Sequence, residues 1–168
     1  MKLIVSPLVH VQNAIGTHRP SHILTLISPD APAVVYDGLN TGCHLTLRFN
    51  DITAPQDGLT APSPEMIHAL LDFANTWDYR APMLVHCLAG ISRSTAAAYI
   101  LACRAAGPGA ESKIAARLRS ASGSATPNAL MVALADDILS REGRMVTAIA
   151  AIGRGEEAAH GSCFEFPV

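Results

Sequence analysis

The segment Met83–Arg104 reads MLVHCLAGISRSTAAAYILACR and joins a short apolar run to a long alanine-rich one. The first run predicts a buried strand, because it is short, apolar and bounded by turn residues. The second predicts a helix over Ser92–Ala106, which the sequence Gly-Pro-Gly then terminates. Cys87 lies where the strand ends, and Arg93 follows six residues later at the start of the helix. Neither side chain suits a hydrophobic core there, so their placement indicates a site that binds a ligand between them.

The connection between this strand and this helix has the features of an anion-binding loop. Ligands of α/β sheets bind beyond the carboxyl ends of the strands, next to the N-termini of helices. Gly90 permits a tight turn in which consecutive backbone N–H groups face inward and surround an oxyanion. The Arg93 guanidinium can hold two phosphate oxygens at once, and a thiol in such an electropositive site ionises readily. These features predict attack of a Cys87 thiolate on a phosphoryl group. The predicted phosphate-binding residues are Leu88, Ala89, Gly90, Ile91, Ser92 and Arg93.

The whole chain predicts an α/β fold, with one domain over residues 1–168 and a central, mostly parallel sheet of about five strands flanked by helices. Short β-rich runs predict strands over Lys2–Ser6, His22–Ser28, Ala33–Tyr36, His44–Phe49 and Met83–His86. Apolar periodicity and capping residues predict helices over Pro64–Asp78, Ser92–Ala106, Glu111–Ser120, a stretch capped by Asn128 that reaches Ile138, and Arg144–Ile152. The tail from about residue 155 has no helical period. Its alternating Phe164 and Phe166 are compatible with an extended strip or with a frayed end.

Composition argues against some kinds of binding partner and indicates a cellular compartment. The 168 residues carry a formal net charge of −2 without a cluster of lysine and arginine, which argues against nucleic acid as a partner. No apolar stretch approaches the ~20 residues of a membrane span, and the N-terminal apolar run is too short for a signal peptide. We therefore expect a cytoplasmic protein that needs neither metal nor cofactor. The four cysteines show no Cys-x-x-Cys spacing, and the sequence leaves the oligomeric state open.

The stretch HCLAGISRS, residues 86–94, resembles the H-C-x-x-G-x-x-R-S/T signature of the cysteine-dependent protein tyrosine phosphatases, including their compact dual-specificity branch. Five fixed positions at these spacings arise by chance in about one chain in twenty thousand, so the pattern is specific. The resemblance implies that Cys87 is the nucleophile, forming a phosphocysteine, and that Arg93 binds the phosphate. It further implies that His86 orients the loop and favours the thiolate, and that Ser94 donates a hydrogen bond to the sulfur.

The resemblance also implies a general acid, an aspartate on a loop upstream of the cysteine. The thirteen residues Asn50–Pro62 form a long connection that contains Asp51 and Asp57. Asp51 directly follows a predicted strand, which can aim its side chain, whereas Asp57 precedes a glycine and suits a turn. We favour Asp51 and keep Asp57 as the alternative, because the Trp-Pro-Asp triplet of the family is absent.

Several alternatives stay open at this stage. The same loop could belong to a phosphoinositide or other small phosphoester phosphatase, although it lacks extra lysines, or to a phosphotyrosine-binding protein without turnover. A rhodanese-like sulfur carrier has no reason to place Arg93 and Ser94 at this spacing. A protective disulfide between Cys87 and Cys103 is conceivable. The expected substrate is a phosphorylated protein, with phosphotyrosine favoured and dual specificity left open, or else a small phosphoester.

Overall fold

Four parallel strands form the centre of the molecule. A computed structural model describes residues 1–36 and 43–168 of the chain. The parallel strands are β1 (Lys2–Pro7), β2 (His22–Ile27), β3 (His44–Arg48) and β4 (Met83–Cys87). With the antiparallel β5 (Phe164–Pro167) they form a five-stranded sheet in the order β3-β2-β4-β1-β5. The predicted α/β class and mostly parallel sheet are therefore confirmed, and β4 is a central strand, as its unbroken apolar sequence requires.

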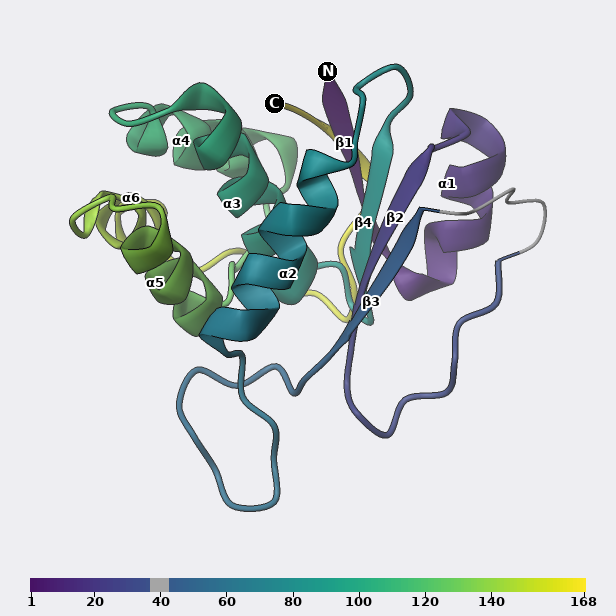
Figure 1. The fold of residues 1–168 in the computed structure, drawn as a ribbon, viewed down its shortest axis with the longest axis horizontal. Helices are drawn as coiled ribbons and strands as arrows, with labels where there is room; N and C mark the ends of the chain where they lie inside the picture. Colours follow the sequence, from purple (N-terminus) through teal and green to yellow (C-terminus); the bar gives the residue numbers. More distant parts are fainter. Residues whose placement is uncertain (37–42) are drawn as a thin grey trace.

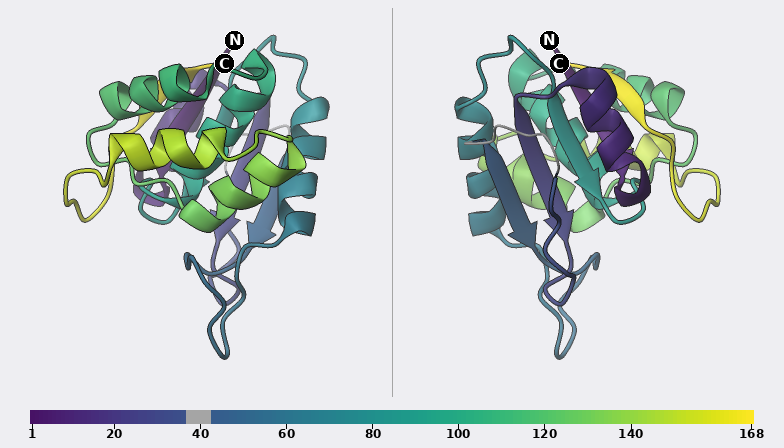
Figure 2. Two further views of the ribbon diagram at one scale, coloured as in Figure 1. Left: turned by 90° about the vertical axis from the view of Figure 1, so that its left-hand side faces the viewer. Right: turned by 90° about the vertical axis from the view of Figure 1, so that its right-hand side faces the viewer.

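Helices cover the two faces of the sheet unequally (Figures 1 and 2). Five helices lie on one face and α1 lies on the other. The five are α2 (Pro64–Asn75), α3 (Arg93–Ala106), α4 (Glu111–Ala121), α5 (Ala129–Ile138) and α6 (Arg144–Ile152). The opposite face is covered by α1 (Val11–His18), which follows a short 3-10 turn at Leu8–His10. Among the described residues, no helix is long and apolar enough to cross a lipid bilayer.

The alternation of side chains along the strands divides the interior into two parts. In β4, Val85 and Cys87 face the larger core beneath α3, while Leu84 faces the smaller core beneath α1. His86 shares the α1 side with Leu84 because successive residues of a strand point to opposite faces. The sheet thus separates the thiol of Cys87 from the imidazole of its neighbour.

Two segments differ from the sequence prediction near the sheet. The strand predicted over Ala33–Tyr36 is wrong, since this segment has no strand conformation. Both edges of the preceding strand β2 are already paired, with β3 and β4, so no place in the sheet is free beside it. The fifth strand is instead the tail: β5 pairs with β1, which places the two ends of the chain side by side (Figure 1). The extended alternative for the tail is the correct one.

Helix α1 is absent from the sequence prediction, although its periodicity is visible in retrospect. Val11, Ala14 and Ile15 have the i, i+3, i+4 spacing of an apolar helix face, and all three are buried. Gly16 and the β-branched residues lower the helix propensity of the segment, so packing on the sheet stabilises this helix. The other five helices match their predicted positions to within a few residues at each end.

Candidate active site

Cys87 is the last residue of β4, and its thiol is almost fully buried at the start of the loop that leads into α3. Its Sγ lies 3.2 Å from the Ser94 hydroxyl. The backbone N–H of Gly90 donates to the same sulfur, also at 3.2 Å. The Gly90 N–H is thus a fixed donor to the sulfur, and the Ser94 hydroxyl lies where it could donate to a thiolate as well.

The carbonyl groups of the loop are held outward by partners from distant parts of the chain. The Leu88 carbonyl accepts from the Leu8 amide at 3.1 Å, and the Ala89 carbonyl accepts from the Gly161 amide at 2.8 Å. Further along, Thr126 N–H donates to the Ile91 carbonyl at 2.9 Å, and Asn128 N–H donates to the Ser92 carbonyl at 3.4 Å. In a planar trans peptide the N–H points away from the C=O. The N–H groups that follow these carbonyls are thereby turned to the opposite side and can form an anion-binding concavity.

Gly90 is required by both its backbone conformation and its surroundings. Its φ angle is +71°, in the left-handed region that side chains rarely adopt. A Cβ atom at this position would lie 2.6 Å from the backbone nitrogen of Pro7. The loop therefore packs backbone against backbone on the end of β1, which allows it to curl beneath the sulfur.

Arg93, the first residue of α3, is fixed in a nearly buried position. Its Nη1 donates to the Phe49 carbonyl at 2.8 Å and to the Ser28 hydroxyl at 3.4 Å, and its guanidinium carbon lies 5.9 Å from the centre of the Phe49 ring. Its buried Nε has no hydrogen-bond partner among residues 1–36 and 43–168. A buried charged donor without a hydrogen bond is costly, and an anionic ligand would satisfy it.

Of the two candidate acids, the structure brings Asp51 to the loop and leaves Asp57 away from it. Asp51 Oδ1 accepts from the Ser92 hydroxyl at 2.7 Å and from the Asn128 side-chain amide at 2.8 Å. Its Oδ2 lies 3.8 Å from Arg93 Nε. Asp57 belongs to the exposed part of the loop that projects beyond the sheet (Figure 1).

Asn128 is a site residue that the sequence revealed only in part. Its predicted role as a helix cap is confirmed, since its Oδ1 accepts from the Met131 amide at 3.0 Å. Its Nδ2 donates to Asp51 at the same time, and this contact joins residues 77 positions apart. One side chain therefore fixes the start of α5 and orients the candidate acid. No local pattern in the sequence signals the second role.

His86 lies on the opposite side of the sheet from the thiol, within a polar cluster. Its Nε2 is hydrogen-bonded to the Thr25 hydroxyl at 2.8 Å and to the Tyr36 hydroxyl at 2.5 Å. Thr25 also contacts His44 Nε2 at 2.9 Å. Burial lowers the pKa of His86 to about 4, so the imidazole is neutral at pH 7. A neutral imidazole carries no positive charge with which to favour a Cys87 thiolate, and the hydrogen bonds of its Nε2 run to Thr25 and Tyr36.

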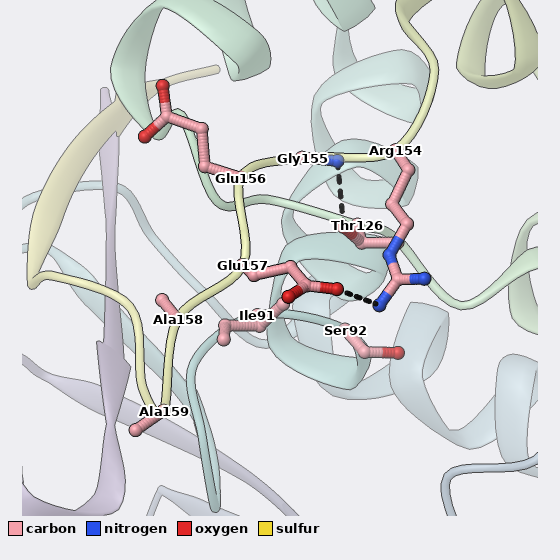
Figure 3. A pocket seen from close by; sticks show the side chains of 9 residues that line it. All are labelled: Ile91, Ser92, Thr126, Arg154, Gly155, Glu156, Glu157, Ala158 and Ala159. Carbon is pink, nitrogen blue, oxygen red and sulfur yellow. Dashed lines mark hydrogen bonds and ion pairs between the residues drawn. The ribbon is translucent and has the colours of Figure 1, made fainter.

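Two hollows adjoin the loop. One, of about 340 Å³, is mainly aliphatic and extends from Leu88 and Arg93 along residues 31–35. The other, of about 780 Å³, lies between Ile91, Ser92, Thr126 and residues 154–159 (Figure 3). Arg154 and Glu157 approach each other across it, 3.6 Å apart and largely exposed (Figure 3). The loop is thus flanked by a mainly aliphatic hollow on one side and by a wider hollow of mixed polar and apolar lining on the other.

The structure does not bring Cys103 close to Cys87. Cys103 is a free, fully buried thiol on α3, about 15 Å along the helix from Arg93 at 1.5 Å per residue. A disulfide needs Cα atoms within about 7 Å of each other. Burial raises the pKa of Cys103 to about 12, which keeps the thiol protonated and unreactive. The structure therefore offers no support for a protective disulfide with Cys87.

Comparison with known proteins gives a structural match only. No protein-family model and no curated protein matches the sequence. Among solved structures, the chain is similar to the crystal structure of DUSP15, a dual-specificity phosphatase, with a TM-score of 0.58 and 17% sequence identity. The match covers 91% of this chain and 92% of that chain. At this identity the likeness establishes the fold, and the chain has the α/β fold of a dual-specificity phosphatase.

Proposed function

We propose that this protein is a cysteine-dependent phosphatase that hydrolyses phosphate monoesters on proteins, phosphotyrosine in particular. The observation that carries the proposal is that the Asp51 carboxyl lies 3.8 Å from an Arg93 Nε without a hydrogen bond, at the end of the same loop whose Gly90 N–H donates to the Cys87 sulfur. Each has a chemical task in phosphoryl transfer, and the fold supports their combination. A reducing compartment such as the cytoplasm would keep Cys87 in its thiol form.

The proposed reaction has two steps. In the first, the Cys87 thiolate attacks phosphorus, a P–S bond forms, and the P–O bond to the alcohol breaks while Asp51 gives its proton to the leaving oxygen. In the second, water attacks phosphorus, Asp51 takes a proton from it, and the P–S bond breaks to return the thiolate and inorganic phosphate. The loop amides and Arg93 stabilise the charge on the phosphoryl oxygens. Ser94, 3.2 Å from the sulfur, supports the departing thiolate.

The surroundings of the loop favour an aryl phosphate on a protein. The aliphatic hollow beside Leu88 and Arg93 offers apolar contact to a ring that leaves as a phenolate. The wider hollow on the other side leaves room for the residues that flank the phosphorylated one. The loop between Cys87 and Arg93 contains no lysine for the additional phosphates of a phosphoinositide. The position of Asp51 argues against a binding protein without turnover.

The test is hydrolysis of an aryl phosphate and of matched phosphotyrosine, phosphothreonine, phosphoserine and phosphoinositide substrates. We expect turnover of the aryl phosphate, with phosphotyrosine preferred among the peptides. Cys87→Ser should abolish turnover and retain vanadate binding, because the backbone amides and Arg93 remain. Turnover that persists in Cys87→Ser would refute the thiolate mechanism. Vanadate binding without any turnover by the wild-type protein would favour the binding protein.

A further inference from the structure

A single peptide unit connects the nucleophile with the tail of the chain. The Ala89–Gly90 peptide presents its N–H to Cys87 Sγ at 3.2 Å. The C=O of the same unit accepts from the Gly161 amide at 2.8 Å. Because the two groups of a planar trans peptide point in opposite directions, a donor that fixes the oxygen on the outside also fixes the N–H on the side of the sulfur. The Gly161 amide therefore determines which way this unit faces.

The position of Gly161 is itself determined by its surroundings. Upstream, the Gly155 amide donates to the Thr126 hydroxyl at 3.0 Å, and the Glu156 amide donates to the Gly123 carbonyl at 3.0 Å. Downstream, β5 pairs with β1. The segment is thus held at both ends as it passes behind the loop.

The closeness of this contact explains why residue 161 is a glycine. A Cβ atom on Gly161 would lie 2.9 Å from the Gly90 carbonyl oxygen, closer than real Cβ contacts come. Gly161 is also buried, so neither water nor a side chain can easily replace its amide. Glycine allows the segment to approach the loop backbone closely enough for a direct hydrogen bond.

We propose that Gly161 is a positioning residue for the Cys87 nucleophile. Its amide holds and polarises the Ala89–Gly90 peptide, so that the Gly90 N–H stabilises negative charge on the sulfur. If the Gly161 amide were lost, this peptide could rotate and present its carbonyl oxygen to the thiolate, which would repel it. This role rests on the proposed function, in which the thiolate is the attacking group.

The sharpest test replaces Gly161 by glycolic acid, which exchanges its N–H for an oxygen and adds no side chain. The matched control places lactic acid at Ala81, in the turn before β4 and away from both hollows, whose amide makes none of the hydrogen bonds described for residues 1–36 and 43–168. Two readouts are needed: the pH dependence of Cys87 alkylation by iodoacetamide, and kcat/KM on an aryl phosphate. Thermal unfolding verifies that both proteins are folded. Gly161→Ala is a simpler variant that keeps the amide but crowds the same backbone.

In the Gly161 ester we expect the midpoint of Cys87 alkylation to move to higher pH. We also expect kcat/KM to fall roughly tenfold, the effect of weakening one hydrogen bond to a charged group. The Ala81 ester should match the wild type in both readouts. An unchanged alkylation midpoint in the folded Gly161 ester would overturn the proposal. Alkylation reports on the sulfur whether or not the protein hydrolyses phosphate esters, so failure of the proposed function would be seen separately, as absent turnover by the wild type.

Discussion

Gly90→Ala tests whether the close contact between the loop and β1 builds the site. The added methyl would meet the Pro7 nitrogen at 2.6 Å and the Pro7 Cα at 2.9 Å, both backbone atoms of a central strand that cannot move independently. Overpacking of this kind costs about 1–3 kcal/mol. A φ of +71° adds about 1–2 kcal/mol for a residue with a Cβ. The free energy of unfolding should therefore fall by about 2–5 kcal/mol.

The assay is thermal and urea unfolding, with vanadate affinity measured on the folded protein. For a chain of this size the loss corresponds to a Tm lower by about 5–20 °C. Gly16→Ala is the matched control. Gly16 lies in α1 without a positive φ, and a methyl added there would meet no atom of another segment within 4 Å, so this variant should be more stable by about 0.5–1 kcal/mol. If Gly90→Ala unfolds like the wild type and binds vanadate equally well, the argument from the Pro7 contact is wrong.

Three further predictions concern the charged and titrating groups. Arg93→Lys should lose most of the phosphatase activity, since a point charge cannot replace a planar two-pronged contact; near wild-type kcat/KM would reduce Arg93 to a structural residue. Asp51→Ala should lower kcat on phosphotyrosine roughly 10²–10⁴-fold and on an activated aryl phosphate less, whereas Asp57→Ala should be mild; exchanged phenotypes would identify Asp57 as the acid. The pKa of His86 is lowered to about 4, so the unfolded chain binds a proton here below about pH 6.5 while the folded protein does not. Its contribution to stability is present above pH 6.5 and is lost as the pH falls toward 4, and the slope of urea midpoint against pH should be smaller in His86→Gln.

The local parts of the site could be predicted from the sequence, because they depend on neighbours along the chain. Strand β4, the loop after it and α3 are contiguous, and Gly90 has the positive φ that a tight turn demands. The end of β3 placed Asp51 near the loop by the same logic, since parallel strands end at a common edge. Each of these inferences needed only local pattern and a general rule of sheet topology.

The remaining parts depend on contacts between distant segments, which local pattern does not encode. Ala33–Tyr36 has the composition of a strand, yet Val35 is largely exposed and Tyr36 is instead hydrogen-bonded to His86, the residue before Cys87. The donors from Leu8 and Gly161 are backbone amides, which almost every residue type carries. The identity of these residues therefore does not indicate the contact. The sequence around Gly161 has no periodicity, so nothing in it indicates that this glycine contacts the loop between Cys87 and Arg93.

Because the tail supports the loop, it also affects when the ordered loop around Cys87 can form during synthesis of the chain. Gly161 is translated after the other residues described for the site. A nascent chain can therefore form β4, the loop and α3 before the Ala89 carbonyl has the Gly161 amide as its hydrogen-bond donor. Pairings between segments far apart in sequence form late, because the intervening chain must first lose its conformational freedom. A ribosome-bound chain that lacks the tail should therefore hold its thiol in an incompletely ordered loop. If the chain is the phosphatase proposed above, its catalytic activity would then begin only once β5 has docked.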